Sequence, residues 1–222
     1  MTDLYLSGGT FFGLGDVEPA TGISRVLTVI ELGLGFAFLA LIISYLPPLN
    51  QAFATRETNI SLLDAKAGSP PTAAEIIKRH SSGEHDVEEL RELLKDWEEW
   101  AATLLENHLS YPVLGYFRSQ HDNVSWLGSL TAILDTCVLV MASVEGQCRR
   151  QAYLTFAMAR HAVVDLSLVF KQEPHEPEVE RLGHATLNEL RSYLRPTGIK
   201  VHDSKEAEDE LARWRRMYDA LS

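Results

Sequence analysis

The sequence predicts an all-α fold in which a single transmembrane helix precedes a cytoplasmic helical bundle. Two observations predict it. Residues 26–46 are almost unbroken apolar sequence, whereas the chain after them carries most of the charge. After residue 83, apolar residues recur at helical spacing, with Glu and Lys between them. No strand-rich stretch, repeat or low-complexity tract interrupts this pattern, so we expect helices throughout.

The apolar segment is long enough to cross a bilayer, since roughly twenty residues at about 1.5 Å each span the hydrocarbon core. A signal peptide is excluded because residues 1–19 contain acidic but no basic side chains. A buried core helix is the alternative. Pro47-Pro48 should end either kind of helix, because proline lacks an amide donor and clashes with the preceding turn.

Flanking charge predicts the orientation of this helix. The segment before it is acidic except for Arg25, and the segment after it is basic. The positive-inside tendency therefore places the N-terminus outside the plasma membrane and the C-terminal domain in the cytoplasm. The basic residues that follow the helix are Arg56, Lys66, Lys78 and Arg79.

Three residues inside the apolar segment suggest a packing or gating role. Glu31 lies about a turn and a half into it, where an ionisable group normally faces a protein partner or a water-filled cavity. A simpler interpretation is a carboxyl group hydrogen-bonded to a neighbouring helix. Gly33 and Gly35 follow, and glycine there allows either close helix packing or a bend.

A glycine-rich loop shortly precedes the apolar helix and contains Gly13-Leu14-Gly15-Asp16. Glycine adopts backbone angles closed to other residues, so successive carbonyl groups can point in one direction. Rings of such carbonyls from several subunits can replace the water shell of a potassium ion.

Residues 5–46 resemble the pore loop and inner helix of the prokaryotic potassium channel family, the two-transmembrane ion-channel domain. The resemblance implies that Gly13, Leu14, Gly15 and Asp16 match the end of its selectivity filter. It also implies K⁺ as the permeant ion, no cofactor, and a homotetramer around the pore axis. Glu31, Gly33 and Gly35 stand where that family often carries a Glu followed by glycines.

The chain departs from the family pattern in two ways. In an ungapped alignment, Thr10 matches the threonine before the filter, Phe11 the filter threonine and Phe12 the filter valine; in the alternative, the filter threonine is absent. Either alignment removes the hydroxyl group of the innermost ion site. The outer helix and most of the pore helix have no counterpart before Gly9, so we expect either a fragment or wrongly started gene product, or a protein that no longer conducts.

The full prediction is therefore a pore loop and single transmembrane helix followed by a cytoplasmic bundle. It comprises a partial pore domain over residues 1–48, a linker with a short helix over 49–82, and an α-helical domain over 83–222. Thr72 is expected to cap the short helix, which ends at Arg79. The first helix of the domain is predicted from the helical spacing of residues 87–105 and should end before Pro112. Further helices are predicted over residues 124–143, 147–170, 178–194 and 204–221. For the helix over 124–143, a membrane span over 126–144 is the alternative.

Charged residues interrupt the apolar pattern of the bundle. Asp135 and Glu145 lie near one helix, and Arg160, His161 and Asp165 lie on the next. They are interpreted as satisfied ion pairs, or alternatively as a ligand or metal pocket in the bundle. No metal-binding or phosphate-binding motif and no nucleophile with a recognisable base is present, so we expect no enzymatic activity.

Composition limits the partners. The chain has 20 Lys and Arg against 31 Asp and Glu, for a formal net charge of −11, which argues against nucleic acid. Cys137 and Cys148 lack a Cys-x-x-Cys spacing, so we expect reduced core thiols and no metal. The first functional hypothesis is a potassium channel in the lipid membrane with a regulatory or assembly domain. The alternative is a non-conducting, membrane-anchored interaction or sensor domain with a degenerate pore loop.

Overall fold

The computed structural model describes residues 20–80, 86–120, 125–143, 147–171, 188, 192 and 205–219. All regular elements in these ranges are helices, which confirms the predicted all-α class. The chain forms two compact units, unit 1 over Met1–Ala52 and unit 2 over Phe53–Ser222.

The first described helix, α2 (Gly22–Ala67), is 46 residues long and contains Pro47 and Pro48 in its interior. The prediction that these prolines end the helix is wrong, and so is the predicted linker for residues 49–67. The prolines remove two amide donors, but residues beyond them form a regular apolar face. Ile60, Leu63 and Ala67 are buried on that face, and their packing favours the helical path.

The start of α2 is fixed by a reciprocal cap. The Thr21 hydroxyl accepts a hydrogen bond from the Ser24 backbone N–H at 3.2 Å, and the Thr21 backbone N–H donates to Ser24 Oγ at 3.0 Å. This pattern satisfies backbone donors that a helix N-terminus otherwise leaves unpaired. The helix therefore begins one turn before the apolar segment.

Two described helices are long and apolar enough to cross a membrane. The most apolar window of α2 has a mean hydropathy of 2.5 and is 11% buried, whereas that of α6 (Gln147–Val169) has 1.2 and is 44% buried. Over residues 22–46 of α2, a stripe through Thr28, Gly35 and Ile42 is buried or half-buried. Around the rest of the helix, these large apolar side chains are more than half exposed: Ile23, Val26, Leu27, Val29, Ile30, Leu34, Phe36, Phe38, Leu41, Ile43 and Leu46.

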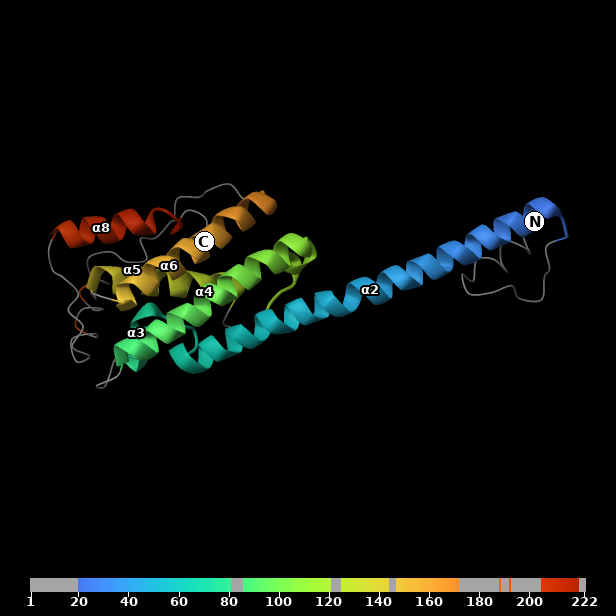
Figure 1. Ribbon diagram of the computed structural model, residues 1–222. Coiled ribbons are helices and arrows are strands. Elements are labelled where there is room, and N and C mark those ends of the chain that lie inside the picture. The colour runs from blue at the N-terminus through green and yellow to red at the C-terminus, as the bar shows by residue number, and fades with distance from the viewer. Residues whose placement is uncertain are drawn as a thin grey trace. The chain divides into compact units, whose positions relative to one another are not determined.

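Unit 2 is a helical bundle around one apolar core (Figure 1). Helix α6 packs against α4 and α5, while α5 also contacts α3 and α8. The remaining elements are α3 (Ala73–Arg79), α4 (Asp86–Ser110), the 3₁₀ helix η1 (Pro112–Tyr116), α5 (Trp126–Ser143) and α8 (Lys205–Arg215). The helix predicted over 178–194 falls almost wholly outside the described residues.

Helix α5 belongs to this core. Leu130, Ile133, Leu134 and Leu139 are fully buried within the bundle, so its apolar character is explained without a membrane. Cys137 on the same helix is buried, as is Cys148, which agrees with the predicted core position of the two thiols.

The short helix α3 is also confirmed. Its N-cap is Thr72, whose hydroxyl accepts a hydrogen bond from the Glu75 backbone N–H at 3.3 Å. Gly68, just before it, has φ +84°, a left-handed conformation that glycine adopts without strain and that turns the chain after α2.

Candidate functional site

The predicted filter residues lie outside the described part of the chain: Thr10, Phe11, Phe12, Gly13, Leu14, Gly15 and Asp16. Glu31, Gly33 and Gly35 lie on α2, which is continuous through both glycines. The Glu31 side chain is half-buried and Gly35 is buried. A Cβ atom added at Gly33 would have no neighbour within 4 Å.

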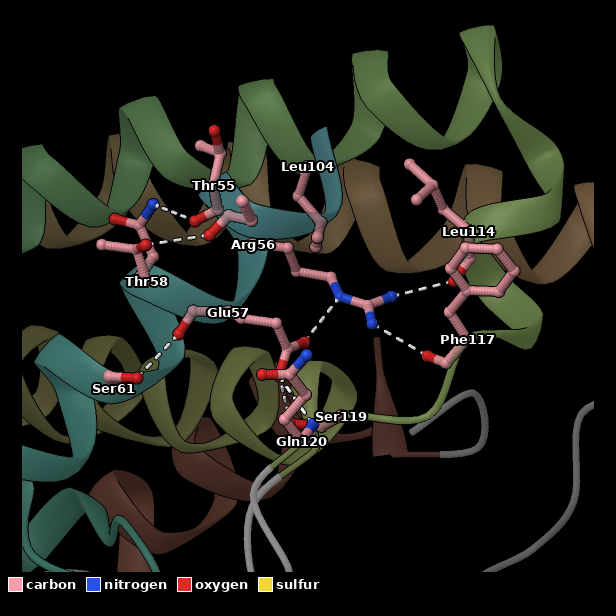
Figure 2. Close-up of polar contacts among 12 residues, drawn as sticks. Thr55, Arg56, Glu57, Thr58, Ser61, Leu104, Leu114, Phe117, Ser119 and Gln120 are labelled. Carbon is pink, nitrogen blue, oxygen red and sulfur yellow. Dashed lines mark hydrogen bonds and ion pairs between the residues drawn. The ribbon is translucent and has the colours of Figure 1, made fainter. Parts of the chain in front are cut away.

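The most elaborate polar site among the described residues is centred on Arg56, at the start of unit 2. Its three guanidinium nitrogens all donate, as Figure 2 shows. Nε donates to Glu57 Oε1 at 3.1 Å, Nη1 to the Leu114 carbonyl at 2.9 Å, and Nη2 to the Phe117 carbonyl at 2.8 Å. Arg56 therefore joins α2 to the chain around η1, some sixty residues later.

Glu57 completes this arrangement from the next position of α2. Its Oε2 atom accepts a hydrogen bond from the Ser119 hydroxyl at 2.8 Å and another from the Gln120 backbone N–H at 2.8 Å (Figure 2). The two side chains thus contact both ends of residues 114–120. We call this set of contacts the Arg56–Glu57 clamp.

The clamp is buried, which determines its electrostatics. Arg56 is 2% exposed and Glu57 is 7% exposed. Burial lowers the pKa of Arg56, while the attraction and hydrogen bond of Glu57 oppose that change. A buried ion pair adds little net stability, yet removing one partner is costly because the other charge stays buried without compensation. The clamp therefore specifies how residues 114–120 dock on α2.

Aromatic rings enclose the clamp. The Arg56 guanidinium carbon lies 5.0 Å from the centre of the Phe53 ring, and Phe53 and Phe117 pack edge to face at 5.9 Å. A cation near the face of an aromatic ring gains electrostatic attraction when water is excluded.

His108, on α4, is 1% exposed and packs against the Trp126 ring at 5.2 Å. Its Nδ1 atom lies 2.8 Å from the Leu104 carbonyl, while its Nε2 atom has no hydrogen-bond partner among the described residues. Burial, with a smaller contribution from the positive charge of Arg56, lowers the pKa of His108, although the Leu104 carbonyl opposes this. A neutral ring whose Nδ1–H donates to Leu104 fits this environment.

A second buried network lies between α5 and the C-terminal segment. The Tyr218 hydroxyl donates to Asp135 Oδ1, and Arg215 Nε lies 3.6 Å from the same oxygen. Arg215 also pairs with Asp219 at 3.3 Å. Burial and the Asp135 carboxylate raise the pKa of Tyr218, which keeps this hydroxyl protonated as a donor.

These contacts revise the charged cluster expected from the sequence. His161 Nε2 and Asp165 Oδ2 lie 3.2 Å apart, but the His161 side chain is 62% exposed, so this pair belongs to the surface. Asp135 is bonded instead to Tyr218 and Arg215. Glu145 lies outside the described residues. The interpretation as satisfied pairs therefore holds for Asp135 and for His161 with Asp165, whereas Arg160 Nε is buried without a hydrogen-bond partner among the described residues. No set of three His, Cys, Asp or Glu in the described ranges could hold a metal ion.

Sequence reasoning missed the clamp. Arg56 entered the prediction only as a positive charge that sets orientation, and Glu57 did not enter it. A signal was present, because Phe53, Arg56, Glu57 and Ile60 follow the spacing i, i+3, i+4, i+7 of one helix face. Charged residues in such positions indicate a buried polar contact.

Comparison of the chain with protein-family models, curated proteins and solved structures gives no match.

Proposed function

We propose that this chain is a membrane-anchored helical protein in which α2 crosses the bilayer and unit 2 is a cytoplasmic interaction or regulatory domain. One observation carries the proposal: the first half of α2 exposes large apolar side chains over most of its surface. Each such side chain gains about 1.5–3 kcal/mol on leaving water. A bilayer supplies the apolar surroundings that this half of the helix requires.

The position of the prolines supports a span over residues 26–46. Roughly twenty residues cover the hydrocarbon core, which places Pro47 and Pro48 at its boundary. Near the boundary, water can bond the carbonyl groups that the prolines leave without donors. The basic residues Arg56 and Lys66 follow on the side expected to be cytoplasmic.

The clamp supports a regulatory role for unit 2. Arg56 lies ten residues beyond the end of the span, and its guanidinium group bonds the carbonyls of Leu114 and Phe117. A change in the position of α2 would therefore act first on residues 114–120. Because the chain beyond residue 53 is a packed bundle, such a displacement would be passed to α4 through η1.

A second candidate function is a potassium-conducting pore subunit. It is favoured by Gly13-Leu14-Gly15-Asp16, which stands shortly before the first residue of α2. In this case four copies would surround the pore, and α2 would be the pore-lining helix. Glu31 would brace the loop, and Gly33 or Gly35 would allow α2 to bend.

Membrane anchoring is tested by alkaline carbonate extraction of cell membranes that contain the full chain. The unchanged protein should stay with the lipid, whereas the double variant Leu34→Arg/Phe38→Arg should be released. Each Arg at the centre of a span costs about 2.5–3.5 kcal/mol. The matched control is Leu62→Arg, at a position of α2 that is 51% exposed but lies beyond the span. Release of the unchanged protein would contradict the proposal.

Conduction is tested by potassium flux into vesicles that contain the full chain. If the second candidate function is right, flux should be present and Gly15→Ala should abolish it, because alanine does not readily adopt glycine's backbone angles. Gly22→Ala, whose added Cβ has open space, is the control and should leave flux unchanged. If the unchanged protein shows no flux, membrane anchoring is the only one of the two candidate functions that remains. Flux that Gly15→Ala does not reduce would contradict the assignment of Gly15 to the selectivity filter.

A further inference from the structure

Unit 2 has an apolar end that its own core does not cover. We define the apolar end as Phe53, Val113, Tyr116, Phe117, Leu168 and Val169. Tyr116 is 79% exposed and Leu168 is 72% exposed, which is unusual for large apolar or aromatic side chains. The set comes from three elements: the α2 segment, the chain around η1, and the end of α6.

Ring contacts show that these three elements meet at one place. Phe53 and Phe117 pack edge to face at 5.9 Å, and Tyr116 and Phe170 pack edge to face at 5.8 Å. Gly115 lies directly against the Phe170 ring, so close that a Cβ atom there would overlap it. Figure 1 shows the ends of α4 and α6 at the same end of the bundle. The ring contacts join Phe53 to Phe117 and Tyr116 to Phe170, and Leu168 and Val169 directly precede Phe170 in the sequence, so we treat these side chains as one surface.

Basic residues border this patch, and acidic residues gather at the opposite end of α4. Arg118 directly follows Phe117, Lys171 directly follows Phe170, and both side chains are exposed. By contrast, every Asp and Glu of α4 except Glu106 lies within residues 86–99. Along α4 the acidic residues thus concentrate away from the apolar end, and Arg118 and Lys171 border that end.

Chain connectivity places this end beside the bilayer. Phe53 follows Leu46 by seven residues, which is about 10 Å along a helix. The headgroup layer extends several ångströms beyond the hydrocarbon core. Phe53 therefore lies no more than about 10 Å beyond the end of the proposed span, within reach of the headgroup region. This step rests on the proposed span of α2.

We propose that the apolar end of unit 2 is a lipid-docking surface that inserts into the headgroup layer of the cytoplasmic leaflet. Tyr116 and Leu168 enter the boundary between headgroups and acyl chains, where tyrosine is favoured because one end is apolar and the other is polar. Arg118 and Lys171 contact lipid phosphates, and the acidic end of α4 faces away from the anionic surface. The surface holds residues 114–120 between the bilayer and the clamp.

The test uses single labelled cysteines in the full chain, reconstituted in vesicles of phosphatidylcholine and phosphatidylglycerol. Leu34→Cys probes the span, Tyr116→Cys the apolar end, and Glu89→Cys the opposite end of α4. Each carries an environment-sensitive fluorophore, and brominated lipids quench those within the bilayer. The native thiols interfere little, because Cys137 and Cys148 are buried and burial raises the pKa of Cys148 to about 11. We expect strong quenching at positions 34 and 116 and little at position 89.

The outcomes separate this inference from the proposed span. Quenching at position 34 without quenching at 116 would overturn the docking surface and leave the anchor. No quenching at position 34 would overturn the span and, with it, this inference. An unquenched label at 116, together with disulfide cross-linking of Tyr116→Cys between two copies, would show that a second copy covers the patch instead.

A charge variant tests the same surface without altering its apolar side chains. With the label at position 116, Arg118→Gln/Lys171→Gln should reduce quenching in phosphatidylglycerol-containing vesicles and have a smaller effect in pure phosphatidylcholine. The control Arg91→Gln, at the opposite end of α4, should have no effect. Equal quenching for the variant and the unchanged chain in both lipids would contradict a role for these cations.

Discussion

The two halves of α2 share a secondary structure but differ in their surroundings. Over residues 22–46, large apolar side chains are exposed around most of the helix. Over residues 53–67, one face is buried, with Ile60 and Leu63 fully enclosed, while Leu62 on the other side is 51% exposed. Continuity of a helix therefore says little about the medium around it, whereas the distribution of its apolar side chains does.

The buried face of the second half also carries a buried charged pair. Arg56 and Glu57 are tolerated there because residues 114–120 supply donors and acceptors for both groups. In the first half, Glu31 is the one acidic residue of the helix, and it is only half-buried.

Removing the cation of the clamp should have the largest effect. Arg56→Ala leaves Glu57 buried without its partner and two carbonyls without a donor, so unit 2 should lose about 3–5 kcal/mol of unfolding free energy. Urea unfolding of the full chain in detergent, followed by tryptophan fluorescence, measures this. The control Arg118→Ala, on an exposed side chain, should change the value by less than about 0.5 kcal/mol. A loss below about 1 kcal/mol for Arg56→Ala would show that the clamp is not needed for folding.

Truncating the buried face of α2 should come next. Ile60 is fully buried, so Ile60→Ala removes packed atoms and leaves a cavity, at a cost of about 2–5 kcal/mol. Leu62→Ala removes a similar volume from the exposed face and should cost less than about 0.5 kcal/mol. Equal losses in urea unfolding would mean that the second half of α2 is not the amphipathic helix described here.

Loss of the Tyr218 hydroxyl should weaken the docking of the C-terminal segment. Tyr218→Phe keeps the ring but removes the donor to the Asp135 carboxylate, and a hydrogen bond to a charged group contributes about 1.5–3 kcal/mol. Proteolysis near residues 205–219 should therefore become faster, with the rest of the bundle less affected. The control is Tyr153→Phe, at a half-exposed tyrosine of α6. Unchanged proteolysis in Tyr218→Phe would show that ring packing alone holds this segment.

The smallest effect concerns pH. Because burial depresses the pKa of His108, folding stability is fully present above the ordinary histidine pKa of about 6.5 and is lost as pH falls below it. The slope cannot exceed about 1.4 kcal/mol per pH unit for one proton. Comparing unfolding free energies at pH 7.5 and 5.5 measures it, and His108→Gln should flatten the dependence. His161→Gln, at an exposed position, is the control and should keep the slope of the unchanged chain.

Several features of the chain could be predicted from neighbouring residues or from composition. The apolar run of residues 26–46, the N-cap at Thr72 and the core position of the two thiols each follow from neighbouring residues or composition, and the structure agrees with them. The helical class follows in the same way, since the repeat of apolar residues every three or four positions is a property of the sequence alone.

The path of α2 beyond the prolines could not be read locally. A proline pair disfavours a helix by its own geometry, and only the burial of Ile60, Leu63 and Ala67 in the bundle offsets that cost. Which of two opposing effects prevails depends on packing partners that the local sequence does not contain.

The helical class and the one strongly apolar segment of the chain follow from its sequence alone. Tertiary structure alone decided which charges are buried and with what partners. Arg56 meets Leu114 across 58 residues, and Tyr218 meets Asp135 across 83. The physical reason is that a buried charge needs specific donors and acceptors, and chain folding, rather than sequence proximity, brings those groups together.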